Sequence, residues 1–162
     1  RALVELEQRL PFVQVITQNV DGLHTVAGSA RVLELHGNIR RFKCLRGHGH
    51  LNTDDLRGQE ERPPLCPQPN CGALVRPDVV WFGENLDHGV LSQAAAFSEA
   101  CDVMLIVGTS GVVQPAAGLP YHAHRARLIE INPEPSELTD AVHIYLPGAA
   151  GEVLPALARL AQ

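Results

Sequence analysis

Short apolar runs alternate along the chain with segments that have helical spacing of apolar residues. The apolar runs that predict buried strands are residues 12–16, 32–35, 79–82, 103–107, 127–131 and 142–146. The helical segments are 1–10, which Pro11 stops, then 22–27, 91–101, 116–126 and 152–161, with Pro155 in the first turn. Strands that alternate with helices predict an α/β fold with a doubly wound parallel sheet.

Residues 43–76 interrupt this alternation. They are rich in proline and glycine, show little periodicity and contain three of the four cysteines. We therefore expect a small irregular insert at 43–76, with residues 1–42 and 77–162 forming one Rossmann-like domain. The run at 103–107 is apolar throughout, which predicts a strand covered on both faces of the sheet.

Composition narrows the class of protein. The 162 residues are 45% apolar and 19% charged, which suits one folded domain with a small insert. The formal net charge is −5 and long basic tracts are missing from the sequence, so nucleic acid is not the expected partner. The longest uncharged run, 103–121, is broken by glycine and proline, which argues against a membrane helix.

Polar corners follow three of the predicted strands, at 17–21, 108–111 and 132–133. In doubly wound sheets, ligands bind beyond the carboxyl ends of the strands. Three such corners predict a common crevice for a nucleotide-like ligand. Taken alone, Gly108-Thr109-Ser110 is equally typical of an ordinary strand-to-helix turn with a serine cap, and the chain has no GxGxxG fingerprint.

His36 follows the apolar run 32–35 directly. A histidine at a strand end titrates near neutrality and can act as a general base. For an isolated histidine, a structural role with a backbone hydrogen bond is the commoner explanation. A catalytic role for His36 is therefore supported only if other motifs point to the same site.

The cysteines predict a metal site. Cys66 and Cys71 are spaced as a Cys-x4-Cys pair, and Cys44 lies upstream. A structural zinc site needs four nitrogen or sulfur ligands, so His48, with His50 as the alternative, would supply the fourth. The alternative is a loop that holds three cysteines without metal. Cys101 is expected to be a core thiol. Reduced thiols in a chain with a large core favour a cytoplasmic location.

Five motifs, in order and spacing, strongly resemble those of the sirtuins, which are NAD-dependent protein-lysine deacylases. They are TQNVDGLH at 17–24, ELHG at 34–37, RPDVVWFGE at 76–84, GTS at 108–110 with Val113 beyond it, and IN at 131–132. The resemblance covers nearly the whole chain and implies a Rossmann-like fold with a small zinc module.

The resemblance also implies roles for individual residues. His36 would be the general base. The residues that would line the NAD pocket are Gln18, Asn19 and Asp21 at the nicotinamide end, Gly108, Thr109, Ser110 and Asn132 at the phosphates and adenosine ribose, and Ala150 at the adenine. The walls of the acyl-lysine tunnel and the clamp on the substrate peptide would be formed by Val80, Phe82, Gly83, Glu84 and Val113.

The implied reaction transfers the acyl group of an acylated-lysine protein substrate to NAD, which releases nicotinamide and O-acyl-ADP-ribose. The Cys-x4-Cys pair and the Trp-Phe-Gly-Glu-Asn-Leu segment look most like the branch that removes succinyl groups, so both deacetylation and desuccinylation are expected candidates.

Two sirtuin segments, Gly-Ala-Gly-x-Ser and an Asp-Phe-Arg loop, do not occur in this sequence, which starts at Arg1 within a helical pattern. We expect the chain to begin after them and to have little deacylase activity alone. The alternative function is a catalytically incomplete module that binds ADP-ribose or an acyl-peptide. The sequence makes no prediction of the oligomeric state.

Overall fold

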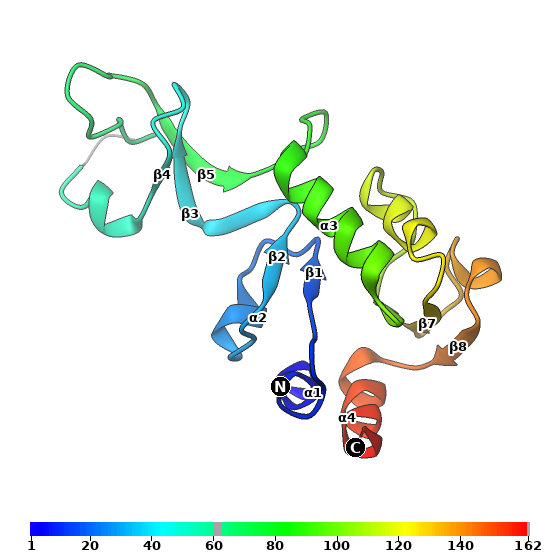
Figure 1. The fold of residues 1–162 in the computed structure, drawn as a ribbon. Coiled ribbons are helices and arrows are strands. Elements are labelled where there is room, and N and C mark those ends of the chain that lie inside the picture. The colour runs from blue at the N-terminus through cyan, green and yellow to red at the C-terminus, as the bar shows by residue number, and fades with distance from the viewer. Residues whose placement is uncertain (60–62, 162) are drawn as a thin grey trace.

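The computed structural model describes residues 1–59 and 63–161 (Figure 1). Its helices are α1 (Ala2–Arg9), α2 (Leu23–Val26), α3 (His88–Ala100) and α4 (Ala150–Leu160), with 3₁₀ helices η1 (Thr53–Leu56), η2 (Ala116–His122) and η3 (Thr139–Ala141). Its strands are β1 (Val15–Thr17), β2 (Val32–Glu34), β3 (Gly37–Cys44), β4 (His50–Leu51), β5 (Val75–Val79), β6 (Val103–Val107), β7 (Arg127–Asn132) and β8 (Ile144–Pro147). None of the helices in these residues is long and apolar enough to cross a membrane.

The parallel α/β architecture is confirmed, and within the described residues its parallel strands form two sheets. β1 pairs with β2, with Val15 opposite Val32. The second sheet has the order β6-β7-β8, with Val103 opposite Arg127 and Ile129 opposite Ile144. The carboxyl ends of β6 and β7 therefore lie side by side, which brings the corners after Val107 and Asn132 together.

The insert is less irregular than predicted, because a third, antiparallel sheet with the order β4-β3-β5 runs through it. Cys44 pairs with Val75 and Lys43 with Arg76, so β3 and β5 extend from the parallel part of the fold into the cysteine-rich region. This sheet occupies the upper left of Figure 1. The exposed Arg40 and the half-buried Arg41 and Lys43 mask the apolar pattern of β3, which is why the sequence pattern missed it.

Other predicted elements also differ. β5 ends at Val79, and the run 79–82 turns instead, since the Glu84 N–H donates to the Trp81 carbonyl. The segment from Ala116 is a 3₁₀ helix that stops at His122. Pro155 lies beyond the first turn of α4, because that helix begins at Ala150. Val103 is 53% exposed, so the expectation that its strand is covered on both faces is wrong at its first residue.

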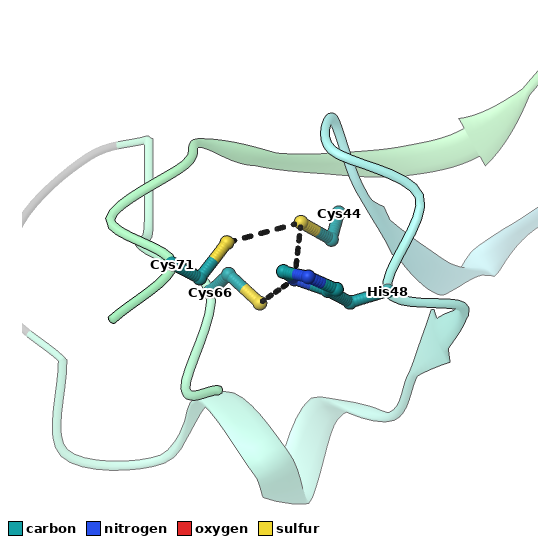
Figure 2. A group of neighbouring side chains, drawn as sticks. All are labelled: Cys44, His48, Cys66 and Cys71. Carbon is teal, nitrogen blue, oxygen red and sulfur yellow. Dashed lines mark hydrogen bonds between the residues drawn. The ribbon is translucent and has the colours of Figure 1, made fainter. Parts of the chain in front are cut away.

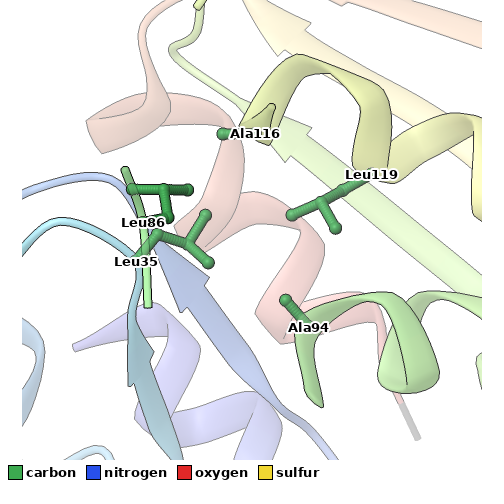
Figure 3. Close-up of a cluster of buried hydrophobic side chains, with 5 residues drawn as sticks. All are labelled: Leu35, Leu86, Ala94, Ala116 and Leu119. Carbon is green, nitrogen blue, oxygen red and sulfur yellow. The ribbon is translucent and has the colours of Figure 1, made fainter. Parts of the chain in front are cut away.

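A buried cluster joins β2 to α3 and η2. Its members are Leu35, Leu86, Ala94, Ala116 and Leu119, whose side chains converge in Figure 3. Leu35 is only 3% exposed and directly precedes His36. The cluster thus holds in place the backbone next to His36, the predicted base.

Candidate functional site

The polar corner after β1 leads into a short helix. The Asn19 N–H donates to Thr17 Oγ1 over 3.1 Å, and the Leu23 N–H donates to Asp21 Oδ1 over 2.9 Å at the start of α2. Asn19 and Asp21 line a cavity of about 520 Å³. Ala150 of α4 lines the same cavity, so three of the predicted cofactor residues are brought together there. Gln18, between Thr17 and Asn19, is half-buried.

His36 sits at the turn between β2 and β3 and is half-buried. Its carbonyl oxygen accepts a hydrogen bond of 2.9 Å from the Val80 N–H. Gly37 follows with a φ of +79°, which places the turn tightly against β5. The backbone of the predicted base is therefore joined directly to the predicted substrate wall.

That wall continues as a compact turn after β5. Glu84 Oε2 accepts from Arg76 Nη2 at 2.7 Å and from the Trp81 N–H at 3.1 Å. The Arg76 hydrogen bond comes first among the contacts that hold the pKa of Glu84 below its ordinary value, followed by the Trp81 N–H. Phe82 is fully exposed at the tip of the turn and Gly83 has a φ of +86°. An apolar ring held on a fixed turn is suited to contact a partner chain.

A second cavity, of about 570 Å³, lies beyond the carboxyl ends of β6 and β7. The predicted residues Gly108, Thr109, Ser110 and Asn132 all line it. Asn132 Nδ2 donates to the Thr109 carbonyl over 2.9 Å, which ties the two corners together. Val113 lies further along the loop after β6, is 38% exposed, and accepts from the Ala117 N–H through its carbonyl.

This cavity fits a nucleotide in its chemistry. Thr109 and Ser110 bring hydroxyl groups to its lining, which can hydrogen-bond phosphate or ribose oxygens. Gly108 has a φ of +61° and open space where a β-carbon would stand, so a ligand can approach its backbone closely.

The sequence reasoning missed Glu130, whose side chain is fully buried in β7 next to this cavity. A charged residue in the middle of the apolar run 127–131 was the available signal. It also missed Asp78 of β5, which is 8% exposed and contacts Arg41, Lys43 and His50.

The four predicted metal ligands gather in the insert (Figure 2). The ligand atoms of Cys44, His48, Cys66 and Cys71 all lie within 4.8 Å of one another. Cys44 Sγ is 3.6 Å from both Cys71 Sγ and His48 Nδ1, and Cys66 Sγ is 3.8 Å from His48 Nδ1. His48 is thus the fourth member of the cluster.

These distances fit zinc. A tetrahedral zinc ion with bonds of about 2.3 Å to sulfur and about 2.0 Å to nitrogen requires neighbouring ligand atoms roughly 3.5–3.8 Å apart. Three thiols and one imidazole nitrogen also match the donor set of structural zinc sites. The three separations given above lie in this range, so the cluster could hold a zinc ion.

The alternative prediction, in which His50 supplies the fourth ligand, is wrong. Its Nε2 lies 3.1 Å from Asp78 Oδ2 and its side chain is 61% exposed, outside the cluster. His50 belongs to β4, whose pairing with β3 places it opposite Lys43, whereas His48 lies on the turn before that strand. Cys101 is also outside the cluster. Its half-buried thiol donates to the Ser98 carbonyl over 3.2 Å.

The cysteines differ in acidity. Burial raises the pKa of Cys44, but hydrogen bonds from the backbone of Arg46 and His48 and from the neighbouring thiols lower it to about 6. Burial raises the pKa of Cys66, and the nearby Cys44 adds to that rise. One thiolate among closely spaced thiols is an arrangement that a cation stabilises.

Two parallel sheets, paired strand-end corners and a Cys3His cluster define an α/β protein with a small module that could hold a metal ion. The Sir2 family profile matches residues 1–115, and the chain belongs to the Sir2 family.

Relatives and solved structures match over nearly the whole chain. An NAD-dependent protein deacylase of Thermococcus kodakarensis is 46% identical over 166 residues, covering 98% of this chain and 64% of the relative. A Sir2 homologue solved as an NAD complex superposes with a TM-score of 0.87 at 42% identity, covering 99% of this chain and 62% of that one. A Sir2 complex with a p53 peptide and NAD+ gives 0.83 at 33% identity, with coverages of 98% and 65%.

The chain therefore spans just under two thirds of the length of these relatives.

Proposed function

We propose that the protein containing this chain is an NAD-dependent protein-lysine deacylase that releases nicotinamide and O-acyl-ADP-ribose. The observation that carries the proposal is the similarity of nearly the whole chain to a relative named an NAD-dependent protein deacylase. The Sir2 complex with a p53 peptide and NAD+ supports a protein as the substrate, and we propose that its acylated lysine is the reacting group. The four free thiols support a cytoplasmic location.

We propose roles for the residues as follows. NAD, when bound, supplies an anomeric ribose carbon with nicotinamide as the leaving group. Asn19 and Asp21 hold the nicotinamide end, with Gln18 beside them, and the Asp21 carboxylate accepts from the carboxamide NH2. Gly108, Thr109, Ser110 and Asn132 hold the phosphates and adenosine ribose, and Ala150 lies by the adenine.

His36 is proposed to accept a proton from a ribose hydroxyl through its imidazole. Its backbone bond to Val80 keeps it beside the acyl-lysine. Once the substrate is bound, Val80 and Phe82 would shield this point from water, which would strengthen the electrostatic interactions within it. Gly83, Glu84 and Val113 hold the substrate peptide. Cys44, His48, Cys66 and Cys71 hold zinc in the insert of residues 43–76, between the two parts of the Rossmann-like domain.

The test is His36→Ala in the whole protein, assayed on acetyl-lysine and succinyl-lysine peptides. A general base contributes roughly 10²–10⁴-fold in rate, so deacylation should fall by that factor. Nicotinamide exchange, which precedes the proton transfer, should survive in part, whereas Asp21→Asn should depress exchange as well. Near-normal turnover by His36→Ala with an unchanged thermal midpoint would refute the assignment.

A second candidate is a module that binds ADP-ribose or an acyl-peptide without turnover. The observation that favours it is that the 570 Å³ cavity is lined wholly by residues between Gly108 and Asp140. Titration of the whole protein with ADP-ribose, alongside an assay for nicotinamide release from an acyl-peptide, separates the two. Binding without release by the whole protein would favour the module.

A further inference from the structure

Glu130 is a buried carboxylate that has no cationic partner among the residues that the structure describes. Its side chain is 0% exposed in the middle of β7, which pairs with β6 on one side and β8 on the other. None of the ion pairs found within residues 1–59 and 63–161 includes it. Burying a charge costs free energy unless hydrogen bonds compensate, and an apolar residue of similar size would avoid that cost. A buried carboxylate at this position is therefore better explained by a function than by stability.

Hydroxyl and amide groups hold this carboxylate. Thr139 Oγ1 donates to Glu130 Oε2 over 2.5 Å, a length typical of a hydroxyl bound to an ionised carboxylate. The same Thr139 Oγ1 accepts from the Ser136 N–H at 2.8 Å. Burial raises the pKa of Glu130, but hydrogen bonds from the side chains of Ser136, Thr139 and Asn132 outweigh burial and hold the pKa below its ordinary value. Glu130 is therefore ionised at neutral pH.

The other carboxylate oxygen faces Asn132. Asn132 Nδ2 donates to Glu130 Oε1 at 3.4 Å and to the Thr109 carbonyl at 2.9 Å. An amide nitrogen has two hydrogens, so both are engaged with the protein. The amide oxygen, Oδ1, takes no part in either bond, and Asn132 lines the 570 Å³ cavity. If the Asn132 amide were flipped, its oxygen would face two acceptors, the Thr109 carbonyl and Glu130 Oε1, so the orientation with the nitrogen on this side is favoured.

We infer that Glu130 is a positioning residue that fixes the amide of Asn132 with its oxygen free to accept from a ligand in the cavity. A site built this way selects a ligand that donates a hydrogen bond at that point, such as a ribose hydroxyl. The inference rests on the proposed nucleotide site and adds to it the residue that sets its preference for ribose. Glu130 acts through Asn132 and touches no ligand itself.

The experiment measures binding of ADP-ribose, and of its analogue with 2′,3′-dideoxyadenosine, to the full 162-residue chain by calorimetry. Glu130→Met removes the acceptor and the charge, and Glu130→Gln keeps an acceptor of the same shape. We expect Glu130→Met to bind ADP-ribose roughly threefold to tenfold more weakly, the worth of one hydrogen bond, and to lose the preference for ribose. Glu130→Gln should restore most of both.

Two controls separate positioning from packing. Thr139→Val removes the hydroxyl that holds Glu130 but leaves Asn132 in place, so it should keep the preference for ribose. In an Asn132→Ala background, Glu130→Met should have no further effect on affinity. Equal losses in the Met and Gln variants, or a Thr139→Val variant that reproduces the whole effect, would overturn the inference.

Asn132→Ala alone keeps the inference testable if Glu130→Met does not fold. If Asn132→Ala still prefers ribose to dideoxyribose, Asn132 is not the acceptor and the inference fails. If the unmodified chain binds ADP-ribose with no preference between the two ligands, the inference fails while the proposed nucleotide site stands. If the unmodified chain binds neither, both fall.

Discussion

A β-carbon added to Gly37 would lie 2.0 Å from the carbonyl oxygen of Asp78. No real β-carbon approaches a backbone oxygen so closely, and the φ of +79° at Gly37 is itself unfavourable for other residues. The contact stands where β3 meets β5, one residue from His36 and its hydrogen bond to Val80. The position of the proposed base therefore depends on a glycine beside it.

Gly37→Ala should destabilise the protein strongly. Left-handed strain costs about 1–2 kcal/mol and the overpacking about 1–3 kcal/mol more, a sum of roughly 2–5 kcal/mol in the free energy of unfolding. Gly58→Ala is the matched control, because Gly58 has a φ of +80° with nothing within 4 Å of the added carbon. Urea unfolding of both variants isolates the clash. If both variants lost the same free energy of unfolding, β5 would have to move aside for the methyl group without further cost.

Asp78→Asn should weaken the link between β5 and β3. Asp78 is buried, and its carboxylate accepts from Arg41 Nε at 2.7 Å with Lys43 Nζ at 3.3 Å. Losing a hydrogen-bonded charge at this place should cost about 1.5–3 kcal/mol of unfolding free energy. Asp54→Asn is the control, since the Asp54–Arg57 pair is exposed and its loss should change little.

Asp78 also predicts a pH dependence. Burial raises the pKa of Asp78, but the hydrogen bond from Arg41 and the surrounding cations hold it below its ordinary value. A lowered folded pKa stabilises the protein fully above the unfolded value, about 3.9, and this contribution disappears as pH falls below it. The stability difference between wild type and Asp78→Asn should therefore shrink in acid. A difference that grows on acidification would contradict the assignment.

Metal content tests the cysteine cluster. Protein purified without chelator should carry one zinc ion per chain, and His48→Ala should lower both the zinc content and the thermal midpoint. His50→Ala is the matched control two residues further on, at the start of β4, and Cys101→Ser is the control for the fourth cysteine, which lies outside the cluster. Both controls should keep their zinc. Full zinc content in His48→Ala would exclude that residue as a ligand.

Local patterns predicted those parts of the molecule that local forces decide. The run 103–107 became β6 with the predicted bounds. The cysteine cluster, which joins residues up to 27 apart, was predicted from residue type and spacing and not from a local pattern. β3 was missed because its charged residues are paired with Asp78, a partner 37 residues from Arg41 along the chain. The choice of His48 over His50 depends on the pairing of β4 with β3, which no local pattern reveals.

Among the described residues, three of the five buried side chains in the core of the insert are the cysteines of the cluster. Leu51 and Val75 are the other two, and the partly buried Phe42, Leu56 and Ala73 pack against them. So few apolar side chains stabilise little structure unaided. We therefore expect the insert to open as a separate unit, with backbone amides around Cys66 and Cys71 taking up deuterium sooner than those around the fully buried Ile131 of β7. A chelator should speed the first exchange and leave the second unchanged, so deuterium uptake in this short segment measures how much of the protein carries its metal.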